Sequence, residues 1–134
     1  MITGIGVDLC DCRRIEAALA RHGDRFAQRV LGDAEWRVYL ERKAAHERRA
    51  VRYVATRLAA KEAFSKAIGL GMTAPMTWRD CQALNGDHGR PVIQLSGELA
   101  RWFDQRRWCA HVSLTDEGDY AQAFVVIETL PTTP

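Results

Sequence analysis

The residues best placed to do chemistry lie in residues 51–71, where the carboxylate of Glu62 stands one helical turn before Lys66. This segment is rich in Ala, Leu, Lys and Glu, contains no Pro and ends in a glycine-rich run, which predicts a long helix. At about 100° per residue, Glu62 falls in the same sector as Ala55 and Leu58. A carboxylate on an apolar stripe is costly unless a cation offsets its charge.

Two kinds of cation could offset the charge of Glu62. Lys66 could form an i,i+4 ion pair, which stabilises a helix by roughly 0.2–0.5 kcal/mol. A metal ion is the other candidate, and it requires a second oxygen ligand from elsewhere in the chain. The helix alone leaves both interpretations open.

Asp8 is the candidate for this second ligand. It lies in residues 2–9, a short apolar segment that alternation predicts to be a strand, with Gly4 and Gly6 on the same face. Two glycines beside an acid indicate that another element approaches this face closely. Asp8 could instead cap the following helix, although Asp11 is available for that role.

Packing of the long helix on the glycine face of the strand would bring Asp8 and Glu62 together. Two carboxylates in one partly buried place repel each other, and a divalent cation would resolve the conflict. An all-oxygen set with few protein ligands suits Mg²⁺, which completes its coordination with water and substrate phosphates. Arg57, Lys61 and Lys66 on the same helix could then hold phosphate oxygens.

The remaining segments predict an α+β fold, with a mostly antiparallel sheet packed by the long central helix. We expect one domain over residues 1–130 and a flexible C-terminal tail at 131–134. A helix capped by Asp33 should turn Trp36 and Leu40 inward. The other predicted helices span 12–21, 26–31 and 97–107, and two hairpins pair strands 78–84 with 91–95 and 110–114 with 120–129.

Composition narrows the classes of function. The net charge of +2 gives little overall attraction to nucleic acid or membrane, although sixteen of the nineteen basic residues are Arg. Residues 42–57 are basic and form either a solvated face or a docking surface for an acidic partner. The four cysteines form no C-x-x-C, and no leader or long apolar run is visible, so we expect reduced thiols and a cytoplasmic protein without membrane contact.

Three blocks of the sequence resemble a known family. GIGVDLCDCRRIE, RLAAKEAFSKAIGLG and HVSLTDEGDYAQAFVVIE are similar, in this order, to the bacterial holo-acyl carrier protein synthases, the small 4′-phosphopantetheinyl transferases. The resemblance covers the chain to about residue 130. It implies Mg²⁺-dependent transfer of the phosphopantetheine arm of coenzyme A to a serine of acidic apo-acyl carrier protein, in fatty acid biosynthesis, with release of adenosine 3′,5′-bisphosphate.

The resemblance also implies roles for individual residues and an assembly. Asp8 and Glu62 correspond to metal ligands and to candidates for the general base, for which we favour Glu62 acting through a water molecule. The family is typically a homotrimer with active sites between neighbouring subunits. The implied coenzyme A contacts are Arg57, Lys61, Lys66, Arg90, Pro91 and His111, and the implied carrier-docking residues are Arg14, Arg21 and Arg25.

Small departures from the family pattern accompany this resemblance. Arg90 stands where a Gly-Lys-Pro loop usually has Lys, Leu58 replaces an aromatic residue, and Asp116 stands where some members have His. Two other functions are compatible with the same residues. One is a small Arg-rich nucleic-acid-binding module that uses residues 42–57, and the other is a structural subunit in which Glu62 pairs with Lys66 and Asp8 is a helix cap.

Overall fold

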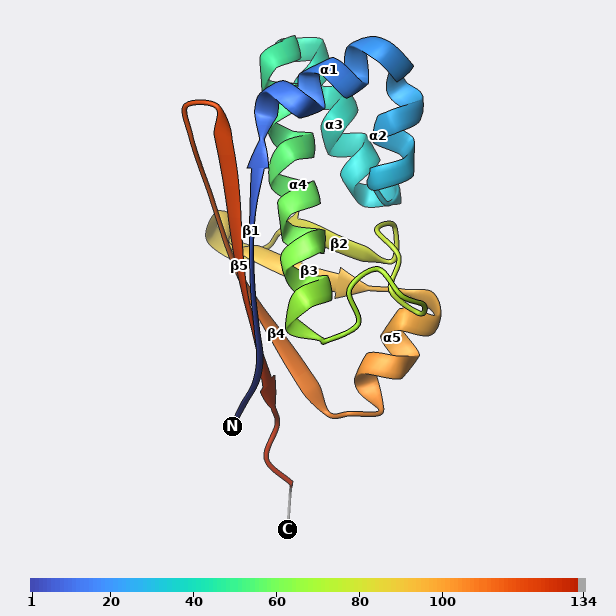
Figure 1. The fold of residues 1–134 in the computed structure, drawn as a ribbon, viewed down its shortest axis with the longest axis vertical. Coiled ribbons are helices and arrows are strands. Elements are labelled where there is room, and N and C mark those ends of the chain that lie inside the picture. Colours follow the sequence, from blue (N-terminus) through green and yellow to red (C-terminus); the bar gives the residue numbers. More distant parts are fainter. Residues whose placement is uncertain (133–134) are drawn as a thin grey trace.

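The computed structural model describes residues 1–132 and places helix α4 in the middle of the molecule, with a sheet along one side and helices above and below (Figure 1). The α+β class is confirmed. In chain order the elements are β1 (Ile2–Asp11), α1 (Cys12–His22), α2 (Asp24–Val30), α3 (Asp33–Ala45), α4 (Glu47–Ala67), β2 (Cys81–Asn85), the 3₁₀ helix η1 (Asp87–Gly89), β3 (Pro91–Leu95), α5 (Gly97–Asp104), β4 (Trp108–Glu117) and β5 (Tyr120–Thr129).

The strands form two separate antiparallel sheets. The larger sheet has the order β1-β5-β4, so the first strand of the chain pairs with the last one. The smaller sheet is the hairpin of β2 and β3. The predicted hairpins are therefore both present, although β2 begins three residues later than expected and β4 extends further at both ends. Helix α5 ends earlier than the predicted residue 107.

The glycines of β1 allow α4 to lie directly on the sheet. A Cβ atom added to Gly4 would collide with the carbonyl oxygen of Ala67, and one added to Gly6 would collide with the carbonyl oxygen of Ala63. The close approach predicted from these glycines is thus confirmed, and the approaching element is the backbone of α4. The contact fixes the position of β1 along α4.

Helix α4 is buried on nearly every side, whereas the sequence predicted that only one apolar stripe would be buried. It begins at Glu47, four residues earlier than expected, after the His46 side chain accepts a hydrogen bond from the backbone N–H of Arg48. The least buried line along its second half is formed by Leu58, Glu62 and Lys66. Its alanines pack closely against the sheet, so a face that looks weakly apolar in sequence is also buried.

Two hydrophobic clusters share α4. The second half of the helix packs with the larger sheet, β2 and α5, and the first half packs with helices α1 to α3. Tyr39 is the inward residue of α3 together with partly buried Trp36, whereas Leu40 is 42% exposed, so its predicted inward orientation is wrong. The helix turns Tyr39 rather than Leu40 toward α4 because adjacent positions lie about 100° apart.

Asp11 is the cap of α1, as expected. Its side chain accepts a hydrogen bond from the backbone N–H of Arg13 at 2.9 Å. The residue that precedes α3 is Gly32, and Asp33 is the first residue of that helix rather than its cap. Because Asp11 caps α1, the carboxylate of Asp8 is left for another role.

Among residues 1–132, no helix combines the length and the apolar character needed to cross a bilayer. After β5, the backbone N–H of Leu130 donates to the carbonyl of Arg107, whose side chain donates to the carbonyl of Pro131. The prediction of a flexible tail at 131–134 falls partly on residues 133–134, which lie outside the described residues.

Candidate functional site

Lys66 links α4 to the carboxylate of Asp8. Its Nζ donates to Oδ1 of Asp8 at 3.1 Å and to the carbonyl of Val7 at 3.0 Å. Asp8 is the next residue after Gly6 on the inner face of β1, and Gly6 touches the helix turn that contains Glu62. The structure therefore brings Asp8, Glu62 and Lys66 to one border between strand and helix, as the sequence predicted.

Glu62 is held by a residue that the sequence did not single out. The indole Nε1 of Trp78, in the loop after α4, donates to Oε1 of Glu62 at 3.1 Å. Within the described part of the chain, Glu62 forms no ion pair with Lys66, which pairs with Asp8 instead. The i,i+4 interpretation is therefore wrong. Glu62 remains partly exposed, so its other oxygen is available to a ligand.

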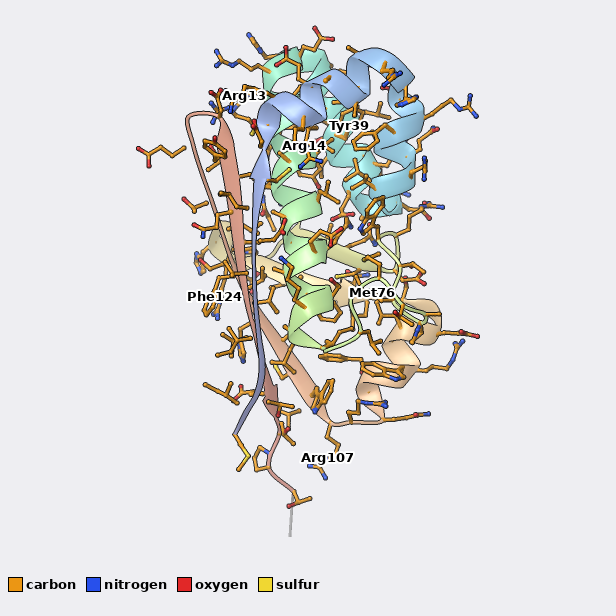
Figure 2. The ribbon with its side chains drawn as sticks, in the orientation of Figure 1. Arg13, Arg14, Tyr39, Met76, Arg107 and Phe124 are labelled. Carbon is orange, nitrogen blue, oxygen red and sulfur yellow. The ribbon has the colours of Figure 1, made fainter. Side chains whose placement is uncertain are left out.

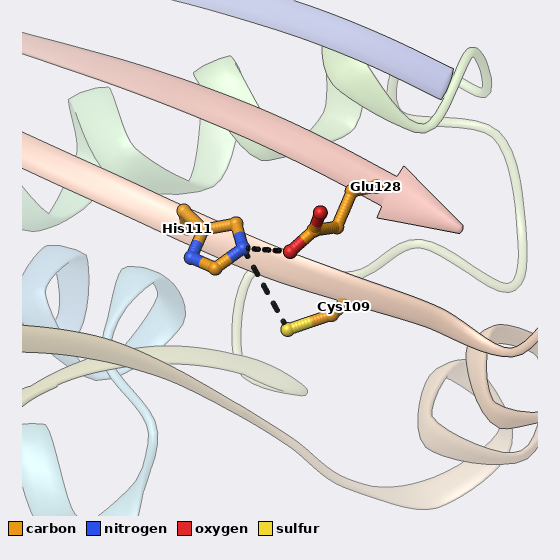
Figure 3. A group of neighbouring side chains, drawn as sticks. All are labelled: Cys109, His111 and Glu128. Carbon is orange, nitrogen blue, oxygen red and sulfur yellow. Dashed lines mark hydrogen bonds and ion pairs between the residues drawn. The ribbon is translucent and has the colours of Figure 1, made fainter. Parts of the chain in front are cut away.

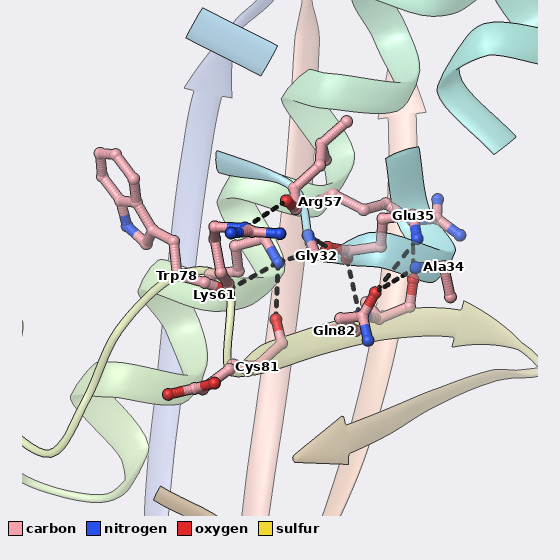
Figure 4. Close-up of polar contacts among 12 residues, drawn as sticks. Gly32, Ala34, Glu35, Arg57, Lys61, Trp78, Cys81 and Gln82 are labelled. Atoms are coloured by element: carbon pink, nitrogen blue, oxygen red, sulfur yellow. Dashed lines mark hydrogen bonds and ion pairs between the residues drawn. The ribbon is translucent and has the colours of Figure 1, made fainter. Parts of the chain in front are cut away.

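Lys61 is fully buried and supports this arrangement from inside. Its Nζ donates to Oε1 of Glu35 at 2.6 Å, to the carbonyl of Cys81 at 2.6 Å and to the carbonyl of Trp78 at 2.9 Å (Figure 4). An ammonium group has three protons, and all three are used. The prediction that Lys61 contacts a phosphate is corrected: it anchors the loop that carries Trp78.

Glu35 completes the buried polar cluster. One carboxylate oxygen accepts from the backbone N–H of Gly32 at 3.0 Å as well as from Lys61, and the other accepts from the N–H of Ala83 at 2.8 Å. The side chain of Gln82 caps the start of α3 beside it, at 2.9 Å from the N–H of Ala34 (Figure 4). A buried ion pair is tolerated only when its other hydrogen bonds are satisfied, and these are.

Arg57 also points into the protein. Its Nε donates to the carbonyl of Ala83 at 3.0 Å and its Nη2 to the side chain of Asn85 at 3.1 Å, while the guanidinium stacks 4.3 Å from the ring centre of Tyr53. Burial lowers the pKa of Arg57 and raises the pKa of Tyr53 to about 12. The predicted ligand contact by Arg57 is therefore replaced by a structural role at β2.

The basic segment 42–57 does not form one continuous charged face. Arg48 and Arg49 are exposed and line a shallow hollow at the start of α4 with Arg52. Arg52 donates to Asp116 at 2.9 Å, and Arg57 is buried. This arrangement disfavours the interpretation of the segment as an extended nucleic-acid surface, which requires a basic groove along the backbone of the nucleic acid.

A second group of predicted residues lies at the larger sheet, away from Asp8. Arg90 and Pro91 line a hollow of about 310 Å³ with His111 and its neighbours on β4. His111 and Ile5 both pair with Val126 and so share a face, whereas Asp8 lies an odd number of residues from Ile5 on β1. Since side chains alternate along a strand, His111 and Asp8 lie on opposite faces of the sheet.

The face that carries His111 also exposes aliphatic and aromatic side chains. Ile5, Val7 and Leu9 of β1 are 58%, 48% and 60% exposed. Phe124 of β5 is paired with Val7 and points away from α4 (Figure 2). The sequence predicted this alternation, but it did not show that the apolar face of β1 would be the outer one. A contiguous exposed apolar patch of this kind marks an interaction surface.

The three arginines expected to bind a partner lie on α1 and α2. Arg14, Arg21 and Arg25 are exposed, and among residues 1–132 none of them takes part in an ion pair.

Comparisons with known proteins agree with this geometry. The model of the 4′-phosphopantetheinyl transferase superfamily matches residues 4–125. A holo-[acyl-carrier-protein] synthase of Leptothrix cholodnii is 61% identical over 129 residues, which cover 96% of this chain and 98% of the relative. Two crystal structures of such synthases also match almost end to end. That from Neisseria meningitidis has a TM-score of 0.86 and 35% identity, and covers 96% of this chain and 100% of its own. That from Bacillus anthracis, in complex with coenzyme A (3′,5′-ADP), has a TM-score of 0.80 and 34% identity, and covers 97% and 99%.

Proposed function

This chain belongs to the 4′-phosphopantetheinyl transferase superfamily, and we propose that it moves the 4′-phosphopantetheine group of coenzyme A to a serine of apo-acyl carrier protein. The observation that carries the proposal is the border of β1 and α4, where Lys66 holds Asp8 beside the turn that contains Glu62. In this role the protein acts in the cytoplasm, in fatty acid biosynthesis, and releases adenosine 3′,5′-bisphosphate.

Asp8 and Glu62 fit a magnesium ion by their chemistry. Both are carboxylates, both are partly exposed, and each has an oxygen that its protein partner does not use. Oxygen donors of this kind, few in number, are what Mg²⁺ takes from a protein when phosphates supply the rest. A bound Mg²⁺ would neutralise the charge that develops on the pyrophosphate as it breaks.

The protein's own groups would position and deprotonate the reactants. The oxygen of the carrier serine attacks the phosphorus attached to the pantetheine arm, and the bond from that phosphorus to the bridging oxygen breaks. We assign Glu62 as the base, accepting the serine proton through a water molecule. Trp78 would keep the carboxylate of Glu62 in one orientation, and exposed Lys66 can reach a phosphate oxygen without leaving Asp8.

The carrier protein would dock on α1 and α2. Arg14, Arg21 and Arg25 present positive charge that no acidic residue of the described chain neutralises, and an acidic partner would complete it. Such contacts act mainly on the rate of association and on partner choice. Arg14→Glu should therefore raise the KM for carrier protein, with little change in kcat, whereas Arg37→Glu, at an exposed position of α3, should change neither.

Coenzyme A would bind between subunits of a homotrimer. Asp8 lies on the α4 side of the larger sheet, whereas His111, which lines one hollow with Arg90 and Pro91, points to the opposite side, so one chain does not gather these residues around Asp8. The exposed apolar face around Val7 and Phe124 offers the surface for a second copy. Phe124→Glu should shift the protein toward monomer in light scattering, and a trimer that survives this change would remove the assignment of that face.

The reaction is tested by mass spectrometry of an apo-acyl carrier protein incubated with this protein, coenzyme A and Mg²⁺. A gain of about 340 Da, one phosphopantetheine joined as a serine phosphodiester, should appear and should vanish with excess chelator. Asp8→Ala and Glu62→Ala should abolish the gain while circular dichroism stays unchanged. Glu98→Ala, at an exposed carboxylate of α5, serves as control. Turnover by Glu62→Ala would remove the assignment of the base and of the metal ligand.

A further inference from the structure

Three side chains with metal-binding atoms meet on the outer face of the larger sheet. Cys109 lies directly opposite Glu128 on the paired strands β4 and β5, and His111 follows two residues later on the same face. The ligand atoms of the three residues all lie within 4.8 Å of one another (Figure 3). Two hydrogen-bonded strands hold them, so the spacing depends on sheet register rather than on a loop.

We propose that Cys109, His111 and Glu128 form a binding site for Zn²⁺. In a tetrahedral site with bonds of about 2.0–2.3 Å, ligand atoms lie roughly 3.3–3.6 Å apart. Sγ of Cys109 is 3.8 Å from Nε2 of His111, and that nitrogen is 2.7 Å from Oε1 of Glu128. Each separation reaches the required value by a side-chain movement of less than about 1 Å.

The donor set selects the kind of metal. A thiolate, an imidazole and a carboxylate together suit Zn²⁺, whereas Mg²⁺ takes oxygen ligands. The pair Asp8 and Glu62 offers only oxygen and lies across the sheet from His111, so the two sites differ in both chemistry and position. Each can therefore be filled and measured without the other.

Binding of the metal has a defined proton balance. Nε2 of His111 donates to the ionised carboxylate of Glu128, so that nitrogen carries the ring proton in the metal-free protein. On binding, Nε2 bonds to Zn²⁺ and the ring proton resides on Nδ1, while the thiol of Cys109 loses its proton to solvent. With neutral His111, one proton leaves for each Zn²⁺ bound.

One chain supplies three ligands, and in the single chain a fourth coordination position is accessible. The side chains of His111 and Glu128 are 46% and 40% exposed, and Cys109 and His111 line the hollow that also contains Arg90. Three protein ligands and one open position are typical of zinc sites that take water or an anion as fourth ligand.

The first test is a zinc titration in competition with a chromophoric chelator, in excess Mg²⁺ so that the carboxylate site is occupied. The wild-type chain should bind one Zn²⁺, and Cys109→Ser should weaken this binding at least about 100-fold, because a ligand matters more than the groups that orient it. Cys10→Ser replaces the other partly exposed thiol and should keep the wild-type affinity. Equal affinity in Cys109→Ser and wild type would overturn the proposal.

Cobalt provides a second, spectroscopic test that needs neither coenzyme A nor carrier protein. Co²⁺ bound at this site should show a near-ultraviolet thiolate-to-metal charge-transfer band, together with visible bands of tetrahedral cobalt. The charge-transfer band should be absent in Cys109→Ser and present in Cys10→Ser, and Glu128→Gln should weaken cobalt binding. A band that persists in Cys109→Ser, or that is missing from the wild-type chain, would refute the assignment whatever the outcome for the transferase.

Discussion

The indole Nε1 of Trp78 lies 3.1 Å from Oε1 of Glu62, and the backbone carbonyl of Trp78 lies 2.9 Å from Nζ of Lys61. One loop residue therefore touches the candidate site with its side chain and the buried Lys61–Glu35 pair with its backbone. Glu62 and Lys61 are adjacent in α4, so Trp78 contacts two neighbouring residues of the same helix. The orientation of the Glu62 carboxylate thus depends on a polar cluster that is buried inside the protein.

Replacement of Trp78 by Phe should impair magnesium use without unfolding the protein. The ring would still fill its place, but the hydrogen bond to Glu62 would be lost, and such supporting bonds are worth about 10–100-fold in metal affinity or activity. We expect a higher Mg²⁺ concentration for half-maximal transfer and an almost unchanged Tm. Trp102→Phe, at the distant α5, is the matched control. Identical Mg²⁺ curves for wild type and Trp78→Phe would contradict the positioning role.

Loss of one partner of the buried pair should be strongly destabilising. Glu35→Gln leaves the charge of Lys61 uncompensated, and Lys61→Met does the same to Glu35, so each should lower the free energy of unfolding by about 3–5 kcal/mol. The double variant should cost less than the sum of the two, measured by urea unfolding. Asp33→Asn, which breaks the exposed pair with Arg79, should cost less than about 1 kcal/mol. Additive effects of Glu35→Gln and Lys61→Met would argue against direct coupling.

Replacement of Gly6 of β1 by Ala should push the sheet away from α4 and destabilise the fold. The Cβ of Gly6→Ala would meet the backbone of Ala63, which cannot rotate away, so we expect a loss of at least about 1–3 kcal/mol in the free energy of unfolding. Gly86→Ala is the control, because the nearest atoms to its Cβ lie at 3.4 Å and its φ is −92°. Thermal unfolding should show a clearly lower Tm for Gly6→Ala alone, and similar Tm values for both variants would rule out the tight contact.

Alkaline pH should destabilise the fold through its buried thiols. Burial raises the pKa of Cys10 to about 11 and that of Cys81 to about 12, against 9.0 for an ordinary thiol. The unfolded chain therefore releases protons near pH 9 that the folded chain retains. This stability is fully present below pH 9 and is lost as the pH rises toward 12.

Urea unfolding of the wild-type chain at about pH 8 and about pH 10.5 should show a lower midpoint at the higher pH. Cys81→Ala should reduce this difference, because it removes the most strongly raised thiol. A midpoint independent of pH would refute the predicted effect of the buried thiols.

The sequence by itself determined the elements of the fold and singled out Asp8 and Glu62 as the carboxylates of the candidate site. Ala-rich composition predicted α4, alternation and the glycines of β1 predicted the strand and its close neighbour, and turn residues predicted both hairpins. Asp11 offered an alternative cap for the following helix, which allowed Asp8 to be a candidate for the site. These features depend on residues near one another in the chain, where the backbone period alone decides which side chains share a face.

Only the tertiary structure decided which partner each charged residue has. Lys66 pairs with Asp8 rather than with Glu62 one turn away, Lys61 is buried against Glu35, and Arg57 turns toward β2. The cluster of Cys109 and Glu128 follows from the register of β4 on β5. Periodicity describes one element at a time, whereas burial and ion pairing arise from contacts between elements distant in sequence, because solvent is excluded only where they pack together.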